Sequence, residues 1–223
     1  MRTLKKGLFF VIDGTDGSGK KTQTDLLYNY LKNEDYPVEK ISFPNYGSPA
    51  AYFVESYLHG KYGATANATD AKLTSLFYAL DRFDKKADIE HMLASGKIVI
   101  ADRYVTANMG HQGSKTSDLE TLKNYFTWLY DLEYNICKIP KPDLNILLHV
   151  SSEINSKLIT DRGNEKDLHE KDPEHLKRAE NAYLTMAKLF PEDMTLIECV
   201  KDEQIMSREE IHEIIKKIVN KLL

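Results

Sequence analysis

The chain has 223 residues, a formal net charge of −4 and a sequence pI near 6.0. This acidic balance argues against electrostatic capture of a nucleic acid polymer, which needs clustered positive charge. The two cysteines, Cys137 and Cys199, lack CxxC spacing, so neither a zinc site nor a disulfide scaffold is expected, and a reducing compartment fits. The first apolar run, Leu8–Ile12, is too short for a signal or membrane segment. We expect a cytoplasmic protein without a membrane partner.

Strand patterns recur along the chain as short apolar runs rich in β-branched or aromatic residues. Leu8–Ile12 is apolar throughout, as in a strand buried on both faces, and it runs directly into Gly14. Apolar residues after the glycines recur at helical spacing, which predicts a helix. The further predicted strands are Val38–Phe43, Ile98–Asp102, Asp143–Val150 and Met194–Ile197. No linker or repeat interrupts the pattern, so we expect one domain over residues 1–223.

Cap residues mark the predicted helix starts between these strands. The starts are Ser48-Pro49, Thr69, Ser117-x-x-Glu120, Asp172-Pro173 and Ser207-x-x-Glu210. The helix from Thr69 is expected to run to Leu93, before Gly96, and the helix from Ser117 to about Asn135. Alternating strands and helices predict an α/β fold, in which a parallel sheet has helices on both faces, because parallel strands need crossover connections.

Three predicted strands end in polar residues, at Asp13-Gly14, Phe43-Pro44 and Asp102-Arg103. Ligands of such sheets bind beyond the carboxyl ends of the strands, so we expect these ends to face one crevice. There, Asp102 can hold magnesium through water, and Arg103 can bind a phosphate through two parallel hydrogen bonds. The alternative is a structural ion pair at a helix start.

A glycine loop lies between the first predicted strand and the first predicted helix. Its residues are Gly14, Thr15, Asp16, Gly17, Ser18, Gly19 and Lys20. Glycines in this setting let backbone N–H groups turn toward phosphate oxygens, and Lys20 can reach the β- and γ-phosphates of a nucleotide. The spacing is GxxGxG rather than the GxGxxG of dinucleotide-binding proteins, so hydride transfer is disfavoured.

One position departs from the full phosphate-loop motif. Lys21 stands where a Ser or Thr hydroxyl usually binds magnesium, and Thr22 follows one position late. Either Thr22 substitutes, or water, phosphate and an acidic strand end hold the metal while Lys21 adds positive charge. A third alternative is that Lys21 points to solvent, as lysines commonly do.

A predicted helix carries a second pair of residues suited to a nucleotide. Tyr78 and Arg82 are four residues apart, so they share one helix face. The ring can stack on a base while the guanidinium donates hydrogen bonds to the edge of that base. The alternative for a helical tyrosine is a place in the core.

A polar segment at about residues 161–171 follows a predicted helix and contains Arg162 and a glycine. This composition suits a short lid that closes over ligands, excludes water and brings a cation to the transferred group. A solvated charged loop is the alternative. His111 and His169 lack partners at ligand spacing, so no histidine metal site is predicted.

Taken together, these residues resemble the thymidylate kinase family from Phe10 to about Leu189. The motifs that carry the resemblance are Asp13-Gly14-x-Asp16-Gly17-x-Gly19-Lys20, Phe43-Pro44, Tyr78-x-x-Asp81-Arg82, Asp102-Arg103-Tyr104 and Pro140-Lys141-Pro142-Asp143. The resemblance implies a five-stranded parallel sheet of the P-loop nucleoside monophosphate kinase type and a homodimer. It also implies ATP and Mg²⁺ as cofactors and phosphorylation of dTMP to dTDP.

The resemblance assigns roles by position. It implies that ATP is held by Gly14, Asp16, Gly17, Ser18, Gly19, Lys20, Lys21 and Thr22. It implies that the acceptor is held by Asp16, Phe43, Tyr78, Arg82, Arg103, Asn108 and Gln112. The implied catalytic residues are Lys20, Asp102, Arg103 and Arg162, with Asp102 toward the metal. The resemblance further implies that Arg162 supplies the lid cation, because Gly17 stands where one branch of the family has arginine.

Three positions depart from the family pattern around the acceptor. Asn45 stands where an arginine often contacts the acceptor phosphate, Ala107 where serine is common, and His111 where an aromatic residue often lies against the sugar. These departures bear on the acceptor, because a few substitutions in a base-recognising pocket can redirect it. The alternatives are a kinase for another deoxynucleotide or a deoxynucleoside, and a nucleotide-binding module without catalysis.

Overall fold

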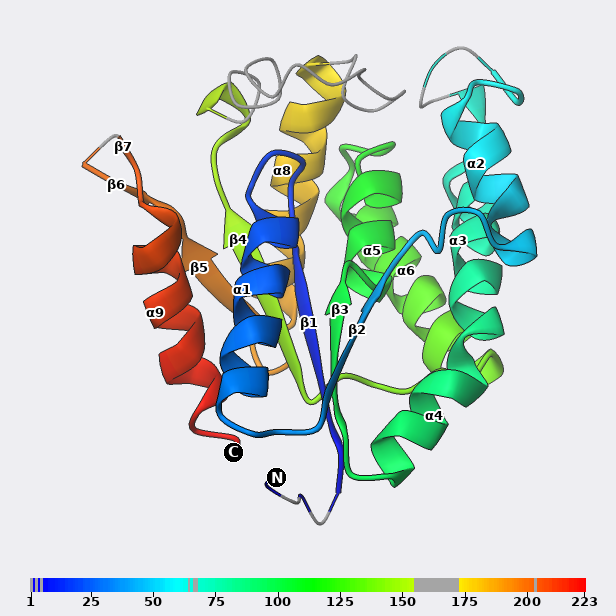
Figure 1. Cartoon of the computed structure of the whole chain (residues 1–223). Helices are drawn as coiled ribbons and strands as arrows, with labels where there is room; N and C mark the ends of the chain where they lie inside the picture. The colour runs from blue at the N-terminus through cyan, green and yellow to red at the C-terminus, as the bar shows by residue number, and fades with distance from the viewer. Residues whose placement is uncertain are drawn as a thin grey trace.

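A five-stranded parallel sheet forms the centre of the molecule (Figure 1). The structure, a computed structural model, describes residues 2, 4, 6–63, 65, 68–154, 173–202 and 204–223. The strand order is β2-β3-β1-β4-β5, and neighbouring strands run parallel throughout. The strands are β1 (Leu8–Gly14), β2 (Val38–Ser42), β3 (Ile98–Asp102), β4 (Leu144–His149) and β5 (Thr195–Glu198). The predicted parallel sheet is confirmed, and each predicted strand overlaps an observed one.

Helices cover both faces of this sheet (Figure 1). They are α1 (Lys20–Asn33), η1 (Pro49–Ala51), α2 (Tyr52–Leu58), α3 (Ala71–Asp84), α4 (Lys86–Ala94), α5 (Val105–Gly113), α6 (Leu119–Tyr130), η3 (Asp131–Ile136), α8 (Pro173–Leu189) and α9 (Arg208–Val219). On one face, α1 and α9 bury Leu27 and Ile215 against Phe10 of β1. On the other face, α5, α6 and α8 pack against Phe9 and Val11. Successive β1 side chains therefore enter opposite cores, as expected of a strand buried on both faces.

The predicted helix caps are confirmed at two positions. The Ser48 hydroxyl accepts a hydrogen bond from the Ala51 N–H at 3.2 Å, and the helix turn after it begins with proline. Ser207 and Glu210 form a reciprocal capping box at the start of α9. The predicted start at Asp172 lies outside the described residues, although α8 does begin at Pro173.

Two other predicted caps are wrong by one residue. Asp70, not Thr69, caps α3 through a bond from the Lys72 N–H to its carboxylate at 2.8 Å. Asp118, not Ser117, caps α6 through a bond from the Thr121 N–H at 2.7 Å. A carboxylate is favoured at both places because it also meets the positive end of the helix dipole. The single helix predicted to run to Leu93 is interrupted at residue 85, which separates α3 from α4.

Helix α5 and a short hairpin were not predicted from the sequence. Every residue of α5 is buried, so the helix shows no alternation of apolar and polar faces. A Cβ on Gly110 would collide with the ring of Tyr183, so glycine lets α5 approach α8 closely. The hairpin pairs β6 (Val200–Lys201) with β7 (Gln204–Ile205). Among the helices of the described residues, none has both the length and the apolar character to cross a membrane.

Candidate active site

The three polar strand ends meet at one edge of the sheet, as predicted. The Arg103 N–H, which follows β3, donates to the Ile12 carbonyl of β1 at 3.0 Å. The Phe43 N–H, which follows β2, donates to the Asp102 carbonyl at 3.0 Å. Arg103 has a φ of 66°, in the left-handed region that non-glycine residues rarely adopt, and such strained positions cluster at functional sites.

The glycine loop connects β1 to α1 at this edge. Gly14 has a φ of 141°, and a Cβ there would collide with the backbone oxygen of Leu148. Gly19 has a φ of 85° and precedes α1, whose first turn has no side-chain cap. The N–H groups of a helix start and a glycine turn together suit an anion, so the loop can receive phosphate groups.

The carboxylate of Asp16, in the middle of this loop, lies beside two cations and one imidazole of the described residues. It accepts a hydrogen bond from Arg103 Nη2, and it lies 3.5 Å from Lys20 Nζ. His111 Nε2 lies 3.8 Å from its second oxygen. Lys20 also donates to the Thr15 carbonyl at 2.7 Å. Lys20 and Arg103 therefore lie on the same side of the molecule, at the crevice expected between the strand ends.

Burial and charge act in opposite directions on the cations of this group. Burial, then the positive charge of Arg103, lowers the pKa of Lys20, although Asp16 favours its charged form. Burial also opposes the charge of Arg103, but the carboxylates of Asp16, Asp102 and Asp13 raise its pKa overall. Arg103 thus stays charged, while the charge on Lys20 costs free energy that an anionic ligand can offset.

Asp13 lies fully buried behind the glycine loop, in contacts that sequence reasoning missed. Its carboxylate accepts hydrogen bonds from the Thr106 hydroxyl, from the Tyr183 hydroxyl at 3.1 Å and from the Gly14 N–H at 2.8 Å. Burial raises its pKa, against the charge of Lys20 and the bonds from Thr106 and Gly14. The carboxylate thereby joins α5 and α8 to the start of the loop.

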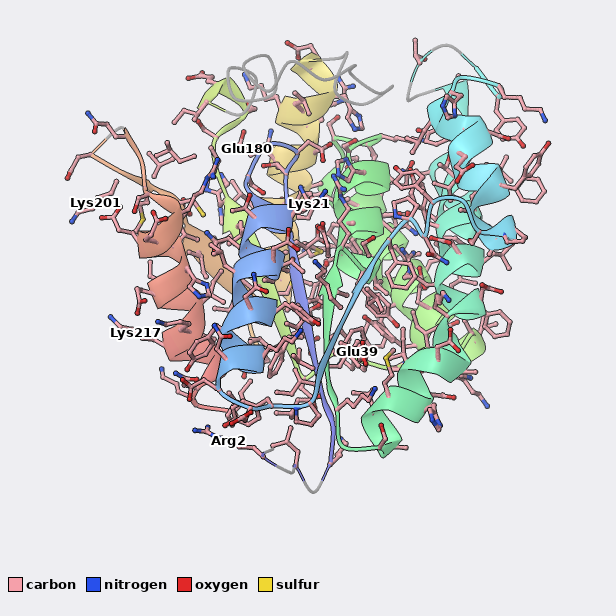
Figure 2. The ribbon with its side chains drawn as sticks, viewed as in Figure 1. Arg2, Lys21, Glu39, Glu180, Lys201 and Lys217 are labelled. Atoms are coloured by element: carbon pink, nitrogen blue, oxygen red, sulfur yellow. The ribbon has the colours of Figure 1, made fainter. Side chains whose placement is uncertain are left out.

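Asp102 is the described residue best suited to a magnesium ion. Its Oδ1 atom is buried and has no hydrogen-bond partner in the part of the chain that the structure describes. Lys21 is exposed at the N-terminal end of α1 (Figure 2). Among the described residues, no group of three or more His, Cys, Asp or Glu side chains is arranged to hold a metal. Any ion here would therefore depend on water and phosphate for most ligands.

A pocket opens beside Asp16. It is lined by Asp16, Phe43, Pro44, Tyr46, Leu58, Tyr78, Arg82, Arg103, Tyr104, Ala107, Asn108, His111 and Gln112. All the residues predicted to hold the acceptor are among them. The Tyr57 ring meets the Tyr78 ring edge-on, with centroids 6.5 Å apart.

Some buried polar atoms in this pocket have no partner among the described residues. Both side-chain atoms of Gln112 and the Oδ1 atom of Asn108 are buried, and they have no hydrogen-bond partner among the described residues. Asn108 is oriented by a bond from its Nδ2 to the Ser75 carbonyl at 3.2 Å. Buried polar groups of this kind can select a ligand by the hydrogen bonds that it supplies.

Arg82 lines the pocket while paired with Glu133, a residue that sequence reasoning missed. A signal for Glu133 does exist, since it lies at helical spacing from the buried Leu122, Phe126 and Leu129. A carboxylate on such a face needs a partner.

The predicted lid, at residues 161–171 with Arg162 and His169, lies outside the described residues.

The fold and the site together define a phosphotransferase of the P-loop nucleoside monophosphate kinase class. Its marks are the glycine loop between β1 and α1 and a second, cationic pocket beyond the strand ends. Residues 12–211 match the family described as thymidylate kinase, and the chain belongs to this family.

Relatives and solved structures agree with that assignment. A thymidylate kinase of Mycobacterium tuberculosis (strain CDC 1551 / Oshkosh) is 30% identical over 186 residues, covering 81% of this chain and 86% of the relative. One from Rickettsia bellii (strain OSU 85-389) is 27% identical, covering 99% of both chains. The structure of thymidylate kinase from Candida albicans superposes with a TM-score of 0.74 at 19% identity, covering 97% of this chain and 92% of the other. The structure of thymidylate kinase from Ehrlichia chaffeensis superposes with a TM-score of 0.67 at 24% identity, covering 96% of this chain and 98% of the other. At these identities the two structures support the fold alone.

Proposed function

We propose that the chain transfers the γ-phosphoryl group of ATP to dTMP, giving ADP and dTDP. The main support is the geometry of Lys20 and Arg103, which both lie beside Asp16, between the glycine loop and the pocket. Phosphoryl transfer depends on positioning and on positive charge around the transferred group, with little covalent chemistry. The relatives named thymidylate kinase support dTMP as the acceptor.

ATP is proposed to lie on the glycine loop. The residues proposed to hold it are Gly14, Asp16, Gly17, Ser18, Gly19, Lys20, Lys21 and Thr22. Asp102 would hold Mg²⁺, since its buried Oδ1 atom has no partner among the described residues. When bound, Mg²⁺ supplies positive charge to the β- and γ-phosphates. Lys20 orients the phosphates and offsets the charge that develops on them.

The acceptor is proposed to occupy the pocket beside Asp16. Arg103 would bind its phosphate, and the Tyr78 ring would stack on its base while Arg82 donates to the base edge. The buried amide of Gln112 and the Oδ1 of Asn108 would bind further polar atoms of the base and sugar. Nothing observed favours an inactive module or a different acceptor over this assignment.

The remaining proposals concern the lid, assembly and location. Residues 161–171 would close over both nucleotides of this one kinase domain, with Arg162 beside the transferred group.

We also propose a cytoplasmic homodimer. An exposed apolar stripe on α3 supports the dimer, because it recurs at helical spacing and such stripes mark protein contacts. Its residues, which are 38–52% exposed, are Leu73, Leu76, Leu80 and Phe83.

A coupled assay of ADP release tests the acceptor. Purified protein with ATP and Mg²⁺ is offered dTMP, dUMP, dGMP, dCMP and thymidine separately. We expect the highest kcat/KM with dTMP. Faster turnover with another acceptor would redirect the assignment within the kinases, and no ADP with any acceptor would reject catalysis.

A further inference from the structure

The guanidinium of Arg82 is fixed by two groups from distant parts of the chain. Its Nε donates to Glu133 Oε2 at 3.1 Å, and its Nη2 donates to Glu133 Oε1. Its Nη1 donates to the Tyr104 carbonyl at 3.2 Å. The side chains of Arg82 and Glu133 are 2% and 0% exposed, so water does not compete for this pair.

These contacts determine which donors of Arg82 remain for a ligand. A guanidinium has five N–H groups, and Glu133 and Tyr104 accept three of them. The other two have no partner in the described part of the chain. Arg82 also lines the acceptor pocket, so these two N–H groups are the ones available to a base edge.

Stability alone does not account for Glu133. It lies in the π-helical turn η3, on the line of buried residues that begins with Leu122 in α6. A buried ion pair gains little over apolar residues of similar volume, because both charges lose their hydration. Single π-helical turns are also frequent at functional sites. The Arg82–Glu133 pair is therefore better explained by its effect on the geometry of the acceptor pocket.

We propose that Glu133 is a positioning residue for acceptor recognition. It holds the Arg82 guanidinium so that two donors face the base, which favours a base edge carrying a carbonyl acceptor over one carrying an amino donor. Among pyrimidines this selects thymine over cytosine. The inference deepens the proposed function and depends on it.

The test uses Glu133→Gln and Glu133→Asp in the full chain. We expect Glu133→Gln to raise the KM for dTMP by about 10- to 100-fold, the loss that follows when a charged hydrogen bond no longer orients its donor. The KM for ATP should stay unchanged, and the ratio of kcat/KM for dTMP over dCMP should fall. Glu133→Asp keeps the charge and should recover part of that ratio. The surface variant Glu90→Gln on α4 is the matched control, with wild-type values expected.

A mutant cycle with Arg82→Gln separates positioning from mere structure. If Glu133 acts through Arg82, adding Glu133→Gln to Arg82→Gln should leave the KM for dTMP where the single variant put it. A further rise in the double variant would overturn the inference. The test compares Arg82→Gln with the double variant, so it does not need a folded Glu133→Gln protein. Circular dichroism checks that Arg82→Gln, which leaves Glu133 buried without its counter-charge, is folded.

The failure of this inference is distinct from failure of the proposed function. A wild-type protein that releases no ADP with dTMP would reject the proposed function, and the inference with it. An active wild type together with a folded Glu133→Gln variant of unchanged KM and unchanged dTMP preference would overturn the role of Glu133 alone.

Discussion

Two arginine–carboxylate pairs lie in the same crevice and differ in how firmly each is held. Arg103 pairs with Asp16, its side chain is 31% exposed, and Asp16 also lies 3.5 Å from Lys20 and 3.8 Å from His111. Arg82 pairs with Glu133, and both side chains are almost completely buried. Among the described residues, the Asp16 carboxylate is thus shared by two cations, Arg103 and Lys20, and the Glu133 carboxylate is bound bidentately by Arg82.

The difference separates two tasks. A shared carboxylate can release one cation, such as Arg103, to a phosphate because a second cation, Lys20, still compensates its charge. A buried carboxylate with one partner cannot, since the remaining charge would be uncompensated. The group around Asp16 therefore suits a ligand whose charge shifts during the reaction, and the Arg82–Glu133 pair suits recognition of a base by fixed donors.

Lys20→Ala breaks the shared group and should have the largest effect. We expect kcat/KM in the ADP-coupled assay to fall by about 10³-fold or more, since a preorganised cation at the transferred phosphoryl group is lost. The melting temperature should change little, because burial lowers the pKa of Lys20 and its charged form is not stabilised by folding. Lys123→Ala, at an exposed position of α6, is the control. Near-normal turnover in a folded Lys20→Ala protein would contradict the role assigned to the loop.

Arg82→Ala breaks the dedicated pair and should affect stability most. It leaves Glu133 buried without its counter-charge, so we expect the free energy of unfolding in urea to fall by about 3–5 kcal/mol. Arg103→Ala should cost only about 1 kcal/mol, because its side chain is partly exposed and Lys20 remains beside Asp16. Equal losses in the two variants would show that the pairs do not differ as described.

The elements that could be predicted from the sequence are those that depend on neighbouring residues. The run Leu8–Ile12 and the glycine loop after it predict a buried strand, a turn and a helix from neighbouring residues alone, and the structure contains all three. Helix α5 could not be predicted in this way. Its burial comes from close packing against Tyr183 of α8, far away in the sequence.

The same limit applies to the site. Residues at strand ends, such as Asp102 and Arg103, were predicted because parallel strands bring those ends together. Glu133 and Tyr183 were not, because their partners lie 51 and 170 positions away and only the tertiary fold brings them together. A polar residue on an otherwise apolar helix face is the one local sign that Glu133 offered.

Tyr183→Phe tests a third carboxylate, Asp13, which lies behind the shared group. The variant removes a hydroxyl that donates to a fully buried carboxylate, so we expect a loss of about 1.5 kcal/mol in the free energy of unfolding. Tyr30→Phe is a matched control, because the Tyr30 hydroxyl bonds Asn220 at the exposed surface and its loss should be close to zero. Equal losses in both variants would mean that the Asp13 contact is as weak as a surface bond.

His149 provides the smallest effect and the one that depends on pH. Its Nε2 lies 2.9 Å from Glu180 and its Nδ1 lies 2.5 Å from Glu198, which is 58% exposed. Burial lowers the pKa of His149, but the bonds to Glu198 and Glu180 raise it overall. Its stabilisation is therefore complete below the unfolded pKa of about 6.5 and is lost as the pH rises through the higher folded pKa. Burial likewise opposes the charge of Glu180, yet the bond to His149 lowers the pKa of Glu180 overall. The stabilisation that Glu180 contributes is therefore present above its unfolded pKa and is lost as the pH falls through its lower folded pKa.

The directions of these two pKa shifts predict that the wild type and a variant without His149 differ in stability only at mildly acidic and neutral pH. His149→Gln should lower the melting temperature by about 2 °C near pH 6, as expected for less than 1 kcal/mol in a partly exposed group. The difference should shrink toward zero near pH 9, where the wild-type imidazole is neutral. His91→Gln, at an exposed position of α4, should show no such trend. A difference that stayed constant from pH 6 to pH 9 would mean that His149 acts by packing rather than by charge.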